Sequence, residues 1–488
     1  MQGKKFYQPK LYTTFNLADK IPDNNFYKCL KAVINLEFVR KETRKYYGKC
    51  GQKSLDPVVF IKLCLVGYFE NINSDRQLIE QSSMRMDIRY FLDYDIDEEL
   101  PWHSTLSRTR QLYGQEVFAR VFKMALKLCI DKSMVGGRRQ AIDSALIKAN
   151  ASMDSLRERE ILDDADDYCN ELCEHEDQGQ SSQKRNIRKI EKSGNDSLYG
   201  EKNLDNQTYY SPTDPDAKIS YKPGKPRKLN YLGQISVDTK HHVITHVQSD
   251  TADKKDSQCL GKVLENTQKN LSSEGLILEE ILCDGNYSSG EVLKDLDEKG
   301  ISGFIPNFGR YKNKREGFSY HPNQDYYKCS QGKILPFKKI ISNSRGKFFR
   351  EYRSSYKDCK QCVLRTTCIG KSAQKQIIDS IDKPYFDRMH EKMQTQHARY
   401  LMKLRQSTVE PVLGTLIEYG GLSKIRTKGI EQANKCMIMA ATAYNLKKWM
   451  KFVNRKAVSV TNVVNKNIEL LFRLLGIQIH VKSCTISC

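Results

Sequence analysis

Apolar residues recur at helical spacing through residues 1–135. Between 114–130 they fall three or four positions apart, which places them on one face of a helix. That face consists of Val117, Phe118, Val121, Phe122, Ala125, Leu126 and Cys129. The segment 56–69 opens with Asp56 and Pro57, residue types favoured at the N-cap and at the first helical position. We therefore predict an all-helical domain over 1–135.

Two shorter segments, 73–84 and 103–113, read as further helices in the same region, with Ser104 available as the cap of the second. Several short helices with a basic late member are typical of a helix-turn-helix-like unit. The same pattern fits an ordinary helical bundle, and the spacing of the helices does not separate the two.

After residue 135 the pattern changes to strands that alternate with helices. The predicted strands are 139–148, 228–238, 241–250, 278–287 and 301–306. The predicted helices are 255–271, 288–300 with Gly300 at its end, 397–421 and 429–453. One strand, a hairpin with its turn at 239–240, and then alternating helix and strand predict a mixed sheet with helices packed on it, an α/β (α+β) fold.

Composition shifts divide the chain further. The predicted domains are a helical domain 1–135, a sheet-containing core built from 136–152, 225–306 and 389–453, a partly helical and flexible insertion 153–224, a basic cysteine-containing insert 307–388, and a C-terminal tail 454–488. The first insertion runs from acidic to basic to Pro- and Gly-rich sequence. Its Cys169, Cys173 and His175 are either metal ligands or solvated residues of an acidic helix.

Charge narrows the class of partner. Of 488 residues, 80 are Lys or Arg and 59 are Asp or Glu, which gives a net charge of +21 spread along the chain. A large cationic protein typically binds nucleic acid through its phosphates, although ribosome or membrane association produces the same balance. Arg108 and Arg110, on the predicted helix 103–113, are the first candidates for DNA contacts, or else solvated arginines of a bundle.

The cellular location of the protein is predicted from the absence of a signal peptide and of a membrane-spanning segment in the sequence. The first residues, MQGKKFYQPKLYTTF, have no apolar signal-peptide region, and no apolar run is long enough to span a membrane. We expect a cytoplasmic protein. Its fifteen cysteines are then free thiols or metal ligands rather than disulfides.

Three carboxylates occupy places where a basic protein has little structural reason to put them. Asp143 lies inside a predicted strand, Asp284 follows another, and Glu410 lies in a predicted helix. Such groups repel phosphate, but they hold divalent cations that bind phosphate oxygens. Each has a structural alternative, because Asp143 and Asp284 suit a helix cap or Asx-turn, and Ser407 with Glu410 forms a capping-box pattern.

The insert 307–388 carries a second candidate metal site. Its cysteines are Cys329, Cys359, Cys362 and Cys368, and the Cys-x₂-Cys pair among them is a common half of a zinc site. The alternative is a set of free thiols. Basic and aromatic neighbours are candidates for tracking a DNA backbone, or for a solvated face: Tyr326, Tyr327, Arg350, Tyr352 and Arg353.

The order of these motifs resembles the DDE transposases of bacterial insertion sequences. The matching stretches are QAIDSALIKANAS (140–152), CDGNYSS (283–289), RQSTVEPVLG (405–414) and 426–448, with PWHSTLSRTR (101–110) similar to the N-terminal domain of the same group. The resemblance covers about residues 5–455. It implies an RNase H-like catalytic core and a DNA nucleotidyl-transfer reaction, with Asp143, Asp284 and Glu410 as the metal-binding triad.

The resemblance carries further expectations. It implies two Mg²⁺ or Mn²⁺ ions at the triad, a zinc-ribbon-like insert, DNA ends and target DNA as partners, and at least a dimer acting on DNA in the bacterial nucleoid. Cleavage at the element's ends would be followed by strand transfer. The alternatives are a catalytically silent DNA-binding protein derived from such an enzyme, and an RNase H-like nuclease without strand transfer.

One departure from the family pattern concerns the positions around Glu410. A Tyr–Arg–Glu–Lys signature in one branch places Arg four residues before Glu and Lys seven after it. Here Arg405 lies five before, position 417 is Ile, and the nearest equivalents, Tyr400 and Lys424, are shifted. The candidate DNA contacts in this part of the chain are Arg405, Lys424, Arg426 and Lys428.

Overall fold

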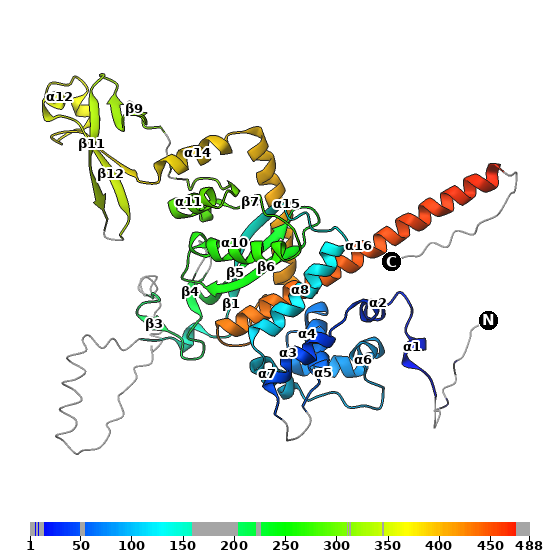
Figure 1. Cartoon of the computed structure of the whole chain (residues 1–488). Helices are drawn as coiled ribbons and strands as arrows, with labels where there is room; N and C mark the ends of the chain where they lie inside the picture. Colours follow the sequence, from blue (N-terminus) through cyan, green and yellow to red (C-terminus); the bar gives the residue numbers. More distant parts are fainter. Residues whose placement is uncertain are drawn as a thin grey trace, which may run out of the picture. The chain divides into compact units, whose positions relative to one another are not determined.

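The computed structural model describes residues 5, 8, 14–48, 54–158, 204–220, 226–309, 311, 314–343 and 346–474, with side chains as far as residue 454 (Figure 1). The chain divides into two compact units. The first consists of residues 1–134, 415–427 and 431–488, and the second of residues 135–414 and 428–430.

The first unit is helical, as predicted. Its N-terminal helices are α1 (Leu17–Lys20), α2 (Phe26–Val33), α3 (Glu37–Thr43), α4 (Pro57–Phe69), α5 (Asp75–Met84), α6 (Met86–Leu92), α7 (His103–Leu112) and α8 (Gln115–Asp131), with a 3₁₀ turn at Arg44–Tyr46. Helix α4 is buried on nearly all sides, because its residues are almost uniformly apolar. On α8 the seven predicted face residues are all buried, so the face read from the sequence is confirmed.

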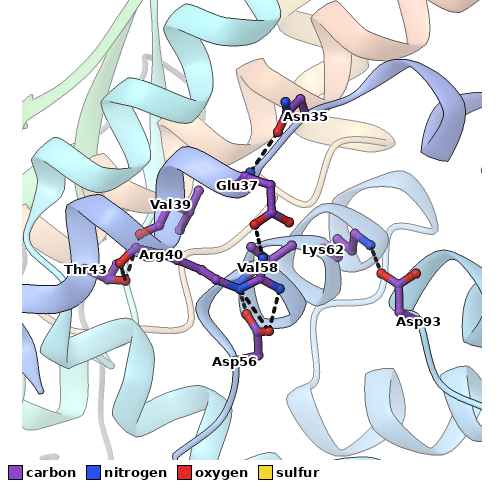
Figure 2. A network of polar contacts seen from close by, with 9 residues as sticks. All are labelled: Asn35, Glu37, Val39, Arg40, Thr43, Asp56, Val58, Lys62 and Asp93. Carbon is purple, nitrogen blue, oxygen red and sulfur yellow. Dashed lines mark hydrogen bonds and ion pairs between the residues drawn. The ribbon is translucent and has the colours of Figure 1, made fainter.

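Polar contacts tie these helices together (Figure 2). The side chain of Asp56 accepts a hydrogen bond from the Val58 N–H at 2.7 Å and pairs with Arg40 of α3 at 2.7 Å. The predicted cap at Asp56 is therefore confirmed. Lys62 of α4 pairs with Asp93, which ends α6 in the left-handed conformation. The predicted cap at Ser104 is wrong, since α7 begins after Trp102 without a side-chain cap.

Helix α16 (Ile430–Leu474) packs in the first unit as well. The indole N–H of Trp449 donates to the Leu128 carbonyl at 2.8 Å, and the Cys129 thiol donates to the Asn445 carbonyl at 3.7 Å. The helix has no break at the predicted boundary between residues 453 and 454. Residues 431–453, predicted as part of the catalytic core, thus lie in the helical unit.

A six-stranded mixed sheet forms the centre of the second unit. Its strands are β1 (Arg139–Lys148), β4 (Lys218–Ser220), β5 (Lys228–Asp238), β6 (Ile244–Thr251), β7 (Glu280–Leu282) and β8 (Ser302–Phe304). Strand β5 pairs antiparallel with β1, β4 and β6, while β1, β7 and β8 run parallel. Apart from the short strand β4, the three antiparallel strands β6, β5 and β1 are followed by β7 and β8, which run parallel to β1, and this order forms the expected RNase H-like mixed sheet.

Helices α10 (Asp256–Ser272) and α11 (Gly290–Glu298) connect the later strands of this sheet. Gly300 follows α11 with φ +65°, a conformation that glycine adopts without strain, so the predicted helix end is confirmed. Strands β7 and β8 are shorter than the predicted 278–287 and 301–306. The chain leaves β7 early because Asp284 starts a 3₁₀ turn at Gly285–Tyr287.

The insert folds as a separate five-stranded antiparallel sheet. Its elements are β9 (Phe318–His321), β10 (Tyr326–Cys329), β11 (Ile334–Ser342), β12 (Phe348–Arg353), α12 (Tyr356–Lys360), α13 (Arg365–Cys368) and β13 (Gln376–Ser380). A small core of Tyr327, Leu335, Tyr352 and Ile377 holds it together. Helices α14 (Lys383–Met393) and α15 (Gln396–Glu418) follow.

The predicted insertion 153–224 is described only at its ends. Strands β2 (Arg157–Glu158) and β3 (Tyr209–Tyr210) pair there. The predicted acidic helix with Cys169, Cys173 and His175 lies outside the described residues. Across the part of the chain that the structure describes, no helix is both long and apolar enough to cross a membrane.

Candidate active site

Strand β1 positions Asp143. The residue pairs with Ile235 of β5, and its neighbour Ile142 is fully buried on the opposite face. The Ser144 N–H donates to its carboxylate at 2.9 Å, and the side chain is 15% exposed. Asp143 is thus a mid-strand carboxylate, and the alternative of a helix cap is wrong here.

Asp284 lies beside it on the sheet. Strand β7 runs parallel to β1 with Leu282 opposite Ala141, so Asp143 and Asp284 each follow a paired residue by two positions. The carboxylate of Asp284 accepts hydrogen bonds from the N–H and the side-chain amide of Asn286, at 3.0 and 3.1 Å. Asp284 therefore forms the Asx-turn that was its structural alternative, and its negative charge also contributes to the raised pKa of Asp143.

Helix α15 supplies the third carboxylate. Glu410 lies well inside this helix, and the Ser407 hydroxyl donates to the Leu404 carbonyl at 3.0 Å instead of capping a first turn. The capping-box alternative is therefore wrong. The Glu410 side chain is 57% exposed, which leaves it open to an incoming ligand.

One guanidinium joins two of these carboxylates. Arg405, on α15, lies 2.8 Å from Asp143 and 3.7 Å from Glu410, and its side chain is only 8% exposed. Its Nε has no hydrogen-bond partner among the described residues. In this structure Arg405, expected as a DNA contact, is buried as the counter-charge of the carboxylates.

The pKa values of Asp143 and Asp284 show that Arg405 does not fully neutralise these carboxylates. Burial raises the pKa of Asp143 to about 6, against the opposing effect of Arg405, and the negative charges of Asp284 and Asp256 add to the rise. Burial also raises the pKa of Asp284, again opposed by Arg405. Both carboxyl groups would therefore be stabilised in their charged form by additional positive charge.

A hydrogen-bonded row behind the carboxylates was not predicted from the sequence. The Tyr287 hydroxyl donates to the Gln234 side chain at 2.5 Å, and the Gln234 amide donates to Asp256 at 3.1 Å. Gln234 lies opposite Ser144 in the β1–β5 register. The only signal in the sequence was a glutamine in the middle of a predicted strand, because a fully buried amide needs partners on both of its ends.

The donor chemistry suits a hard divalent cation, since all three side chains offer carboxylate oxygens. Within the described ranges, however, no three His, Cys, Asp or Glu side chains gather closely enough to hold a metal ion as they stand. A bound ion would thus need small side-chain movements, which the exposed Glu410 permits.

The other residues predicted to contact DNA differ in their exposure and in their ion pairs. Arg108 is exposed on α7, whereas Arg110 makes a two-pronged ion pair with Asp75 at 2.7 and 2.9 Å. Lys424 and Arg426 line a cavity of about 280 Å³ in the first unit, together with Arg110. Lys428 is exposed in the second unit.

The four cysteines of the insert are free and half-buried. Cys329 ends β10, and the others lie on or beside α12 and α13. The Cys359 thiol lies 3.0 Å from the Ser354 hydroxyl. No closely gathered metal-ligand set is formed by these cysteines in the residues that the structure describes.

The basic and aromatic residues predicted to track DNA in the insert are mostly structural. Tyr327 and Tyr352 are core residues with 2% and 1% exposure. Arg350 pairs with Asp325 at 2.8 Å, and Arg353 pairs with Glu351. These four side chains are therefore engaged within the insert itself.

Comparison with known proteins finds two family models that match parts of the chain. A family model described as a transposase domain (DUF772) matches residues 15–112, which contain helices α1 to α7. A model of the transposase DDE domain matches residues 328–450, which contain Arg405 and Glu410. These two parts of the chain are therefore similar to transposase domains.

Solved structures of transposases also match this chain. The piggyBac transposase synaptic complex with hairpin DNA is 12% identical, with 95% of this chain and 88% of that chain covered and a TM-score of 0.24. The Mos1 transposase paired-end complex with the left transposon end is 11% identical, with 61% and 76% covered and a TM-score of 0.16. No curated protein sequence matches the chain. The fold assignment therefore rests on the strand order of the sheet.

Proposed function

We propose that this protein is a DDE transposase, catalytically active and metal-dependent, and that it binds the ends of an insertion sequence, cuts them and joins them to target DNA. The observation that carries the proposal is that three carboxylates from separate elements lie around one buried guanidinium, that of Arg405. Asp143 lies on β1, Asp284 follows the adjacent parallel strand β7, and Glu410 is linked to Asp143 through Arg405.

A pair of divalent ions, Mg²⁺ or Mn²⁺, fits this donor set. Asp143 and Asp284 are partly buried and incompletely neutralised, which is unfavourable without additional cations. When bound, such ions activate the attacking oxygen and stabilise the leaving oxygen of an in-line phosphoryl displacement. The three carboxylates would hold them, with Glu410 closing the site from the helix side.

The reaction needs no protein nucleophile. A water oxygen bonds to the phosphorus at the element's end, the bond from phosphorus to the 3′ oxygen breaks, and a 3′-hydroxyl is released. That hydroxyl then bonds to a phosphorus of target DNA, and the target's own 3′ oxygen leaves. The role of this chain is to orient the two DNA strands on the exposed side of Glu410 and to hold the charges there.

The DNA would be held by exposed basic residues outside the carboxylate site. We assign this role to Arg108, Lys424, Arg426 and Lys428, because Lys and Arg neutralise phosphates. Arg110 and Arg405 are assigned supporting roles, since each is engaged in an ion pair. Pairing two DNA ends also calls for at least two copies of the chain, acting in the bacterial cytoplasm.

The insert is proposed to bind one structural zinc ion through Cys329, Cys359, Cys362 and Cys368. The support is that all four thiols belong to one small module, where a metal would add to a core of only four buried residues. Metal analysis of the purified protein tests this, and a zinc-free folded protein would refute it.

The decisive experiment for the function uses DNA that carries the flanks of this gene. Wild-type protein with Mg²⁺ is expected to cut at the element's ends and to produce joined products, while Asp143→Asn and Glu410→Gln bind the same DNA without cutting it. Glu418→Gln is the matched control, because Glu418 lies exposed on the same helix α15.

The alternatives are separated by the same experiment. Binding without cutting by the wild type would favour a silent DNA-binding protein, and cutting without joined products would favour a nuclease that performs no strand transfer. Cutting by Asp143→Asn at the wild-type rate would refute the assigned triad.

A further inference from the structure

Strands β11 and β12 form a ribbon within the insert sheet (Figure 1), and the other side of β12 pairs with β13 along residues 349–353. Strand β10 pairs only with residues 334–336 of β11, whereas residues 337–342 pair with β12 alone. We call the exposed side chains of this ribbon the hairpin patch, which consists of Phe337, Lys338, Lys339, Ile340, Lys347 and Phe348.

The apolar part of the hairpin patch continues the face that holds the insert's core. Phe337 pairs directly with the buried Tyr352, and their ring centroids are 6.0 Å apart. Ile340 lies on the same face because an irregularity between Phe337 and Lys339 shifts the register and places Ile340 opposite Arg350. Phe348 follows on that face too, since Tyr352, Arg350 and Phe348 are two positions apart on β12. Their exposures are 39% for Phe337, 55% for Ile340 and 59% for Phe348. Adjacent exposed apolar side chains of this kind mark an interaction surface more often than isolated ones.

The charged part of the patch is positive and unpaired. Lys338, Lys339 and Lys347 form no ion pair with any residue that the structure describes, whereas Arg350 and Arg353 are both paired. Residues 326–353 contain eight Lys and Arg residues and a single acidic residue, Glu351, which is buried. The positive charge exposed on the ribbon is thus not compensated within the insert.

We propose that the hairpin patch is a DNA-binding surface, an inference that rests on the proposed function because it takes DNA as the partner. The patch follows the unpaired edge of β11 and the end of the hairpin, so a DNA duplex could lie along it. In that position the three lysines would reach phosphates, and Phe337 and Phe348 would contact the sugars. The charge favours this partner, since a polyanion neutralises all three lysines together.

A second copy of the chain fits the patch less well. A two-fold contact would bring the same patch of both copies together and place its lysines against one another. Pairing of the free β11 edge with another β11 edge would have the same effect.

The test compares two variants of the full chain in which three lysines are replaced by alanine. One carries Lys338→Ala, Lys339→Ala and Lys347→Ala, and the matched control carries Lys357→Ala, Lys360→Ala and Lys371→Ala on another surface of the same insert. All six lysines are exposed. Both variants lose three positive charges from the insert, so they differ only in the position of the lost charges. The dependence of DNA affinity on salt is measured by fluorescence anisotropy with a duplex of arbitrary sequence.

The patch variant is expected to reduce the log–log salt slope by about 2 to 3, or about 0.9 for each lost phosphate contact. The control is expected to leave the slope unchanged. Phe348→Ala is expected to weaken binding about tenfold without a change in slope, because it removes an uncharged contact. These two readouts separate the ionic and the apolar parts of the surface.

Two outcomes would overturn the inference. Equal slope changes in the two lysine variants would mean that only general charge matters. Unchanged DNA binding by the patch variants, with loss of a dimer in sedimentation, would assign the patch to a second copy. The proposed function fails separately, because absence of Mg²⁺-dependent cleavage in the wild type leaves the comparison of salt slopes intact.

Discussion

Replacing Asp143 by asparagine is expected to stabilise the metal-free protein at neutral pH. Burial raises the pKa of Asp143 from its ordinary 3.8 to about 6, even though Arg405 lies 2.8 Å away. A shift of this size means that ionising Asp143 costs the folded state about 3 kcal/mol at pH 7. The amide carries no charge, so Asp143→Asn removes this cost. Arg405 keeps its contact with Glu410.

The sign of the pH dependence follows from proton binding. Because the folded-state pKa is the higher one, the folded protein binds more protons than the unfolded chain between about pH 4 and pH 6. The wild type therefore loses stability as the pH rises through that window, and the variant does not. The advantage of Asp143→Asn should be full at pH 7.5, about half as large at pH 5, and absent near pH 4.

Denaturant unfolding in EDTA at these pH values measures the effect, with the wild type and the variant compared at each pH. Asp238→Asn is the control, because this buried carboxylate accepts hydrogen bonds from the Gly136 and Gly137 N–H groups at 3.1 and 2.8 Å. Its amide would face those donors, so this variant should be destabilised at every pH. A loss of stability in Asp143→Asn at pH 7.5, or a gain that does not depend on pH, would refute the reasoning.

Three further outcomes are expected. Arg110→Met should destabilise the helical unit by about 3 kcal/mol in denaturant unfolding, because it leaves Asp75 unpaired, whereas Arg108→Met should weaken DNA binding in anisotropy with little change in stability. Burial lowers the pKa of His246 to about 4, so the wild type should lose stability as the pH falls from about 6.5 to 4. His246→Asn should lose less stability over this range, as measured by thermal unfolding at each pH. Cys359→Ser should reduce bound zinc from about one ion per chain in metal analysis, and a zinc content equal to that of the wild type would argue against the proposed site.

The elements that local pattern determines were predicted well from the sequence. The buried face of α8 and strand β1 around Asp143 follow from apolar spacing, because both bury one continuous face. Strand β7 was predicted too long, since its apolar run continues past the point where Asp284 turns the chain. Spacing alone does not show where a strand leaves its sheet.

Side-chain partners could not be predicted in the same way. Arg405 reads as a DNA contact in the sequence because it is basic and close to Glu410, yet its charge is used inside the site, against Asp143 on a strand 262 positions earlier. Tyr352 likewise reads as an exposed aromatic residue and forms part of the insert's core. Such pairings depend on the tertiary fold, which brings together residues that are far apart along the chain.

The ion pairs of Arg405 also explain how the carboxylates of a cation-binding site can stay in place when no cation is bound. A buried guanidinium holds Asp143 in place and reaches toward Glu410, but it leaves the pKa of Asp143 and of Asp284 raised, so the internal charge balance is incomplete. Complete neutralisation by protein groups would remove the electrostatic drive to bind a metal ion. Incomplete neutralisation lowers the stability of the metal-free fold and keeps that drive, which is the usual relation between stability and activity at a functional site. The predicted gain in stability of Asp143→Asn and its predicted loss of cleavage therefore have the same physical origin.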